Sequence, residues 1–329
     1  MKALLGPLVT IALLAAMAAV LPHFLNPYLL RIVLLMGINI VLAVSLNLVN
    51  GFTGQFSIGH AGFMALGGYT AAMVSIKLGQ GAAVALAAAG LPLIAAQGVV
   101  FLAALMLGGI VSAIAGYLVG LPSLRLRGDY LAIVTLGFGE IIRVVILNVD
   151  AVGGARGLPG IPQWSNFFWV FLWAVIVVMV SRNLAHSTHG RALFAIRDDE
   201  IAAEALGVDT TRYKVLAFVM GAFFAGVAGG LSAHNDAYLN PSSFTFLRSI
   251  EVIAMVVLGG MGSISGSVLA AIILTLMPEA LRGLKDYRMV IYALMLIVLM
   301  ITRPQGLLGT RELSFPWSKR KPQSAGGKA

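Results

Sequence analysis

Five long stretches without a charged side chain constrain the fold of this chain more than any other feature. They cover residues 32–76, 78–124, 157–181, 215–235 and 252–278. A membrane-spanning helix needs about 20 consecutive apolar residues, whereas a transmembrane barrel alternates apolar and polar positions over segments of about ten. These runs are continuous and do not alternate. We therefore predict an all-α, polytopic integral membrane protein, a helical bundle with about ten spans of that length.

The predicted spans cover residues 3–21, 28–48, 58–77, 99–121, 129–147, 166–181, 213–233, 248–260, 263–277 and 288–302. Gly90 and Pro92 interrupt the apolar segment 82–97, so we do not count it as a span. We expect a short external segment there. The stretch 248–277 fits either two short spans or one re-entrant element. The N-terminal stretch also fits a signal peptide, but its apolar run exceeds the usual 7–15 residues, so a first span is favoured.

The distribution of basic residues predicts the orientation of these spans. Lys2, the turn at 125–127, the segment 182–214 and the basic end of the chain all fall on one side of the scheme, and the opposite side holds only Arg156 and three residues within 282–288. Cytoplasmic loops carry an excess of Lys and Arg. We expect both termini in the cytoplasm, with a transmembrane domain over 1–310 and a basic cytoplasmic tail over 311–329.

Composition and missing motifs exclude several functional classes. Hydrophobic residues make up 59% of the chain and charged residues 11%, against about 25% charged in soluble domains. A soluble enzyme, a disordered chain and a nucleic-acid binder are excluded despite the net charge of +9. The chain has no cysteine, no phosphate-binding loop of the G-x-x-x-x-G-K-[ST] type and no metal-ligand spacing among its five histidines. We expect no enzymatic activity, no metal and no cofactor on this chain.

The longest hydrophilic interruption, about residues 182–212, is a candidate docking segment. Its acidic residues suit the first turn of a helix, where unpaired backbone N–H groups favour negative charge. Apolar residues follow at helical spacing, and a glycine suits the left-handed end of the helix. The residues concerned are Asp198, Asp199, Glu200, Ile201, Ala205, Leu206 and Gly207. A solvated surface helix is the ordinary interpretation, but the other loops are short, so we favour docking.

A glycine-rich stretch at 51–68 carries polar residues inside otherwise apolar sequence. The candidate pathway residues here are Asn47, Asn50, Gln55, Ser57 and His60. Irregular backbone at membrane depth is tolerated only where it is buried in protein or lines a cavity, and broken helices hold substrates in other transporters. Close helix packing is favoured over pore lining, and the two are compatible. The stretch 259–266 is a candidate pseudo-repeat, and G-x-x-x-G spacings at 116–120 and 226–230 predict packing.

Glu140 and Arg143 are charged residues well inside a predicted span. Glu140 follows the expected start of its helix by eleven positions, about 16 Å of rise. An arginine three positions on is within reach of it. We favour a structural ion pair facing the bundle interior. The alternative is a contact for a substrate ammonium group or a proton site.

Several motifs together resemble one transporter family. They are SLNLVNG at 45–51, GQFSIGHAGF at 54–63, LRLRGDYLAIVTLGFGE at 124–140, GGARGLPGIP at 153–162 and RPQGLLG at 303–309. The segment 182–212 is similar to the cytoplasmic coupling loop of ABC-importer permeases. The whole of 190–231 resembles the M-type permeases of the branched-chain amino acid (Leu/Ile/Val) importers. The family pattern would place Thr where this chain has Val152.

The resemblance implies a permease that forms half of a translocation pathway in a bacterial inner membrane. Its partners would be a homologous second permease, two cytoplasmic ATPases that bind the ATP, an extracytoplasmic substrate-binding protein and membrane lipid. In the coupling loop, buried contact would come from Ile201, Ala202, Ala205 and Leu206. Rim ion pairs would come from Arg197, Asp198, Asp199, Glu200 and Glu204.

Two alternatives remain open at this point. Urea and short-amide permeases share this architecture, and substrate identity rests on the resemblance alone. A proton- or sodium-coupled secondary carrier belongs to a different class and would use Glu140, and Glu251 as a second coupling group. Its uptake would collapse with the proton gradient and disappear in Glu140→Gln.

Overall fold

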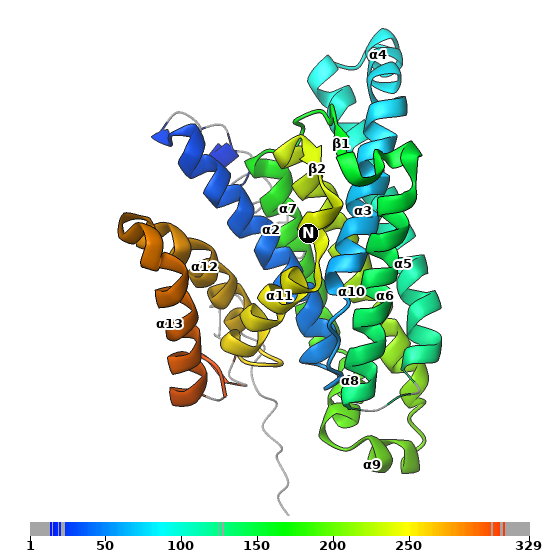
Figure 1. The fold of residues 1–329 in the computed structure, drawn as a ribbon. Coiled ribbons are helices and arrows are strands. Elements are labelled where there is room, and N and C mark those ends of the chain that lie inside the picture. Colours follow the sequence, from blue (N-terminus) through cyan, green and yellow to red (C-terminus); the bar gives the residue numbers. More distant parts are fainter. Residues whose placement is uncertain are drawn as a thin grey trace, which may run out of the picture.

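The computed structural model describes residues 24–303 except 125 and 127, together with residues 14, 16–18, 20, 305–309 and 312. Helices dominate this part of the chain (Figure 1). They are α2 (Pro27–Asn50), α3 (His60–Val74), α4 (Gln80–Ala88), α5 (Leu93–Ser123), α6 (Asp129–Asn148), α7 (Phe167–Ala185), α8 (Thr188–Asp198), α9 (Glu200–Ala205), α10 (Thr210–Asp236), α11 (Phe246–Gly259), α12 (Ile264–Ala280) and α13 (Arg288–Thr302). Two short strands, β1 (Leu158–Pro159) and β2 (Tyr238–Leu239), pair antiparallel.

Within the described residues, seven helices are long and apolar enough to cross a membrane. They are α2, α3 with its π-helical extension to Gly79, α5, α6, α7, α10, and α12 with the turn that follows it to Gly283. The prediction of an all-helical membrane protein is confirmed. The count of about ten spans stays a prediction, because α11 and α13 have 14 and 15 residues and most of 3–21 lies outside the described residues.

The segment 82–97 is mostly helical, and its external location stays a prediction. It contains most of α4 and the first turn of α5, which starts at Leu93 and not at the predicted position 99. Gly90 and Pro92 separate the two helices. Gly90 has φ of +100°, and Pro92 occupies the N-cap of α5. The two residues therefore mark a tight turn between helices.

Two helices form the centre of the bundle. In the most apolar stretch of α2, 78% of the residues are buried, and in that of α10 72%, against 22% for α6. Helices α3 and α5 pack directly on α10. A methyl group on Gly67 of α3 would overlap the backbone of Gly226 in α10. The glycines at 116–120 and 226–230 likewise lie against neighbouring helices, so the packing role predicted for them is confirmed.

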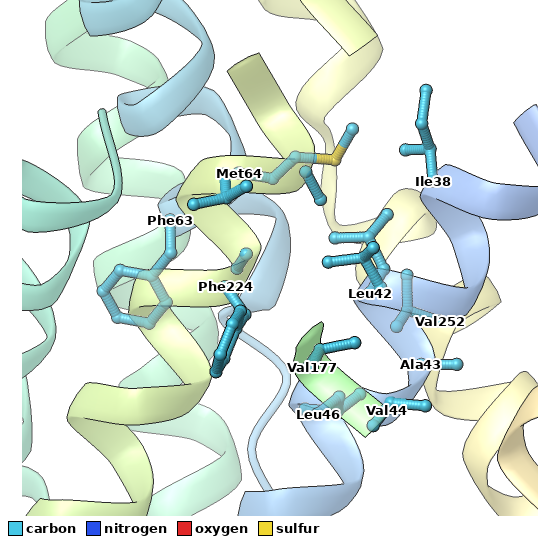
Figure 2. Packing of buried hydrophobic residues seen from close by; sticks show 14 of the residues in the cluster. Ile38, Leu42, Ala43, Val44, Leu46, Phe63, Met64, Val177, Phe224 and Val252 are labelled. Carbon is cyan, nitrogen blue, oxygen red and sulfur yellow. The ribbon is translucent and has the colours of Figure 1, made fainter. Parts of the chain in front are cut away.

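The buried core joins helices that are far apart in sequence. Figure 2 shows Leu42 and Leu46 of α2 lying among side chains from α3, α7, α10 and α11, among them Phe63, Phe224 and Val252. These residues are all in one hydrophobic cluster. Apolar side chains therefore face inward between helices as well as outward, as expected for a membrane bundle.

The two ends of the bundle differ in character. Helices α8 and α9 lie at one end, and the β1–β2 pair lies toward the other, near α4 (Figure 1). We call these the α8–α9 end and the β1–β2 end. Segments without α-helix interrupt the bundle at 51–59, 237–245 and 260–263, the second of which contains a 3-10 turn at Pro241–Phe244. At the last of these, the segment 248–277 forms two helices, α11 and α12, joined by a turn with Gly260 and Gly262 at positive φ. This arrangement fits both two short spans and one re-entrant element.

Candidate functional site

The predicted docking segment consists of two helices. Helix α8 extends through Asp198, and Asp199 then caps the six-residue α9, its carboxylate accepting the backbone N–H groups of Ile201 and Ala202 at 2.9 and 3.0 Å. The placement of Asp198 in the first turn of the later helix is therefore wrong, because the extended backbone of Asp199 separates the two. Gly207 adopts the expected left-handed conformation, with φ of +83°.

The apolar residues of α9 face away from the bundle. Ile201 is 68% exposed and Leu206 85%, and Ala202 and Ala205 are exposed as well. Ala203 alone among its alanines is buried. Ile201 and Leu206 are large apolar side chains at the α8–α9 end, and the described part of the chain leaves them uncovered. We call Ile201, Ala202, Ala205 and Leu206 the α9 face.

The charged residues of the segment mostly have partners within the chain. Glu200 pairs with Lys214 of α10 at 2.6 Å, and the Lys214 side chain is only 3% exposed. Arg197 pairs with the adjacent Asp198 at 3.0 Å. Asp199 serves as a helix cap. The Glu200–Lys214 pair joins the start of α9 to α10 of the bundle, so the α9 face is held in a defined position.

Arg197 also connects this segment to two of the non-helical breaks. Its Nη1 lies 3.5 Å from the carbonyl oxygen of Gly51. Its side chain lies so close to Gly54 and Gly262 that a Cβ on either glycine would approach Arg197 atoms to about 3 Å. Its guanidinium group also lies over the ring of Phe194, 5.1 Å from the centroid. One side chain of α8 thus touches both glycine-rich loops, 51–59 and 260–263.

The two glycine-rich loops are in direct contact with each other. Asn47 accepts the backbone N–H of Gly262 through its side-chain oxygen at 2.9 Å. A Cβ on Gly51 would overlap both Asn47 and the backbone N of Gly262. This contact places the two stretches proposed as pseudo-repeats side by side.

The five candidate pathway residues near the first loop are buried within this chain. Asn47, Asn50, Gln55, Ser57 and His60 are all between 1% and 7% exposed. Asn50 accepts the backbone N–H of Ser57 at 3.3 Å, and the His60 ring contacts the Ser45 hydroxyl at 2.8 Å. These contacts hold the loop in shape. They agree with the packing interpretation, and a pathway role stays a prediction.

Some polar atoms in this loop and in the last turn of α2 before it have no hydrogen-bond partner among the described residues. They are Asn47 Nδ2, Asn50 Nδ2 and Gln55 Oε1. Gln55 lies on the wall of a cavity of about 290 Å³, which is also lined by Arg197, Glu200 and Lys214. Buried polar groups usually have partners, so the loop retains hydrogen-bonding capacity next to the α8–α9 end.

Glu140 makes two contacts at the middle of α6. Its Oε2 accepts the Nε–H of Arg143 at 2.7 Å, which is the predicted ion pair. Its Oε1 accepts the backbone N–H of Phe246, the first residue of α11, at 3.2 Å. The side chains of Glu140 and Arg143 are 29% and 24% exposed. Each carboxylate oxygen of Glu140 therefore accepts a hydrogen bond from another residue of this chain.

Three further charged residues are missing from the sequence-based site. Arg248 pairs with Glu251 at 2.7 Å and donates to Asn39 of α2 at 2.7 Å. Asp236 ends α10 and pairs with Arg31 at 2.9 Å. Lys214 is the buried partner of Glu200 described above. The i, i+3 spacing of Arg248 and Glu251 within a predicted span is a signal that identifies that pair; the partners of Asp236 and Lys214 lie too far away in sequence.

Comparison with known proteins gives consistent matches. A family model described as the permease component of the branched-chain amino acid transport system matches residues 28–300. The high-affinity branched-chain amino acid transport system permease protein LivM of Salmonella typhimurium is 40% identical over 306 residues, 82% of this chain and 68% of that protein. LivM of Escherichia coli is 37% identical, over 90% of this chain and 73% of its own length. The permease protein LivH of Escherichia coli is 33% identical over 153 residues, 46% of this chain and 47% of that protein.

Proposed function

We propose that this chain, which belongs to the branched-chain amino acid transport permease family, acts as a permease subunit of an importer for these amino acids. It carries substrate through the membrane, and the energy comes from ATP bound and hydrolysed on separate subunits. The chain itself takes part in no covalent chemistry and binds no cofactor. The observation that carries this proposal is the fixed, uncovered α9 face at the end opposite β1–β2.

The α9 face is where an ATPase subunit docks. Ile201 and Leu206 provide large exposed apolar groups, and interface cores are built from such groups. Asp198 and Glu204 lie exposed beside them and form the polar rim. Lys214 and Glu200 hold the helix against α10, so movement of the ATPase is passed to the bundle as a rigid displacement.

The assembly contains one more permease, two ATPases and an extracytoplasmic binding protein. The partial similarity to LivH proteins supports a second, related permease beside this chain. Each permease provides half of the pathway. The complex lies in a bacterial inner membrane with the α8–α9 end in the cytoplasm, as the basic residues of the segment 182–214 support.

Substitution of the α9 face tests this proposal. Ala205→Arg places a charge in the middle of the docking surface and Gly207→Pro removes the left-handed turn that ends α9. We expect both variants to insert into the membrane, to lose the ATPase subunits on purification and to lose leucine uptake. Arg191→Gln is the matched control, since it changes an exposed residue of the neighbouring helix α8 that lies outside the α9 face and its rim. Unchanged uptake in Ala205→Arg and Gly207→Pro would overturn the docking role.

A further inference from the structure

A second cavity lies toward the β1–β2 end, between α2, α3, α10 and the segment that leads into α11. Its volume is about 200 Å³. One water molecule accounts for about 30 Å³, and pockets for drug-sized ligands have about 300–1,000 Å³. The cavity is therefore suited to a small molecule of several heavy atoms, the size class of a single amino acid.

Opposite charges line this cavity. Asp236 comes from the last residue of α10 and Arg248 from the first turn of α11. The contacts of Asp236 with Arg31 and Asn235 both use its Oδ1. Arg248 donates to Glu251 and Asn39 through one N–H of each terminal nitrogen, and a guanidinium group has five N–H donors. Both groups thus retain hydrogen-bonding capacity.

The rest of the wall includes a set of apolar side chains. They are Leu35 of α2, Met64 of α3, Leu239 of β2 and Phe244 of the turn before α11. Met64 is in the same buried cluster as Leu42 (Figure 2). Methionine and branched aliphatic groups adapt to an aliphatic guest without leaving polar atoms unpaired. One cavity therefore has an anionic group, a cationic group and an aliphatic surface.

The backbone along this cavity is irregular. After α10 the chain turns through Ala237, which has φ of +56° and is the one non-glycine position with positive φ in the described part of the chain. Asn240 then caps the next turn, accepting the backbone N–H of Ser242 at 3.0 Å. Irregular backbone at membrane depth is found where it is buried in protein or lines a cavity, and transporter sites use such breaks. The break at 237–245 is thus explained as one wall of a binding site.

We infer that this cavity is a transit site for the substrate within the permease: Asp236 binds the α-ammonium group, Arg248 the α-carboxylate, and Leu35, Met64, Leu239 and Phe244 the branched aliphatic side chain. The inference rests on the proposed function, because it takes branched-chain amino acids as the cargo. It adds that the permease itself recognises the zwitterion and the aliphatic group after the binding protein has released them.

Direct binding tests this site separately from transport. The importer, purified through a tag on this chain and reconstituted in lipid nanodiscs without the binding protein, is titrated with radiolabelled leucine. Leucine amide lacks the carboxylate, 4-methylpentanoate lacks the ammonium group and glycine lacks the side chain. We expect saturable leucine binding, and each of the three analogues to compete at least about tenfold more weakly, because each lacks one recognised group.

Substitutions identify the cavity as the place of binding. Asp236→Asn keeps the shape but loses the charge, so leucine binding falls while 4-methylpentanoate binding does not, and the preference for leucine over 4-methylpentanoate disappears. A merely structural role for Asp236 would not change this preference. Met64→Trp fills the cavity and abolishes leucine binding. Met106→Trp is its control, since Met106 lies 38% exposed on α5 and away from the cavity wall.

Transport by the complete importer, measured with binding protein and ATP, separates the two claims. If the wild type imports leucine but shows no saturable binding without the binding protein, the transit site is overturned and the proposed function stands. The same holds if Asp236→Asn keeps the preference for leucine over 4-methylpentanoate. If the wild type does not import leucine, the proposed function fails, and the transit site with it.

Discussion

The carboxylate of Glu140, in the middle of α6, accepts the backbone N–H of Phe246, the first residue of α11, although the two are 106 positions apart in the chain. The start of a helix has unpaired N–H groups and favours negative charge. Glu140 satisfies this need and pairs with Arg143 through its other oxygen. It therefore fixes the level at which α11 begins relative to α6.

Glu140→Gln should leave leucine uptake within about tenfold of the wild type, because the amide oxygen still accepts the Phe246 N–H. Collapse of the proton gradient in energised vesicles supplied with ATP should also leave the initial rate unchanged. A secondary carrier that uses Glu140 requires the opposite in both experiments. Complete loss of uptake in Glu140→Gln, together with sensitivity to a protonophore, would contradict a structural role.

Glu200→Ala should destabilise the protein by about 3 kcal/mol, because it leaves the buried Lys214 without its carboxylate partner. The melting temperature of the purified importer reports this loss. Lys214→Met combined with Glu200→Ala should recover most of it, since no buried charge remains. Glu204→Ala, at an exposed position of the same helix, is the control. An equal effect of Glu200→Ala and Glu204→Ala would rule out the buried pair as an anchor of α9.

Gly226→Ala should cost about 1–3 kcal/mol through overpacking, because its added Cβ would collide with Ser112 of α5 and the backbone of Gly108. Gly137→Ala is the matched control on α6, where nothing lies within 4 Å of an added Cβ. That change should be neutral or gain up to about 1 kcal/mol from helix propensity. Folded yield and thermal unfolding in detergent distinguish the two. Similar behaviour of both variants would show that α10 is not packed through glycine.

Arg197→Ala should uncouple ATP hydrolysis from transport, because Arg197 contacts both glycine-rich loops from α8. We expect the ATPase subunits to remain bound and basal hydrolysis to persist. Stimulation by leucine-loaded binding protein should fall at least about tenfold. Arg191→Ala changes an exposed arginine on the same helix and serves as the control. Full stimulation in Arg197→Ala would argue that coupling runs through other contacts.

Local sequence patterns predicted much of this protein. Apolar runs located the seven helices of the described residues that are long and apolar enough to cross a membrane, because a lipid environment imposes length and hydropathy on each helix separately. The spacing of Glu140 and Arg143 predicted their ion pair, since i, i+3 contacts depend only on helix geometry. The left-handed Gly207 was predicted for the same reason.

Contacts between distant segments were not predictable in the same way. The acidic residues 198–200 indicated the start of a helix, but they did not identify Asp199 as its N-cap or Asp198 as the end of the preceding helix. The pairing of Glu200 with Lys214, and the approach of Asp236 and Arg248 to one cavity, depend on how helices pack in three dimensions. Local patterns therefore located elements, and packing determined which charges meet.

The most direct test of the central claim is purification of the tagged chain from its native membrane in mild detergent, followed by identification of the proteins that accompany it. The account predicts a second, homologous permease and cytoplasmic ATPases with phosphate-binding loops, in a complex that hydrolyses ATP. Recovery of the chain alone or as a homo-oligomer, under conditions that preserve other membrane complexes, would contradict an ATP-driven importer.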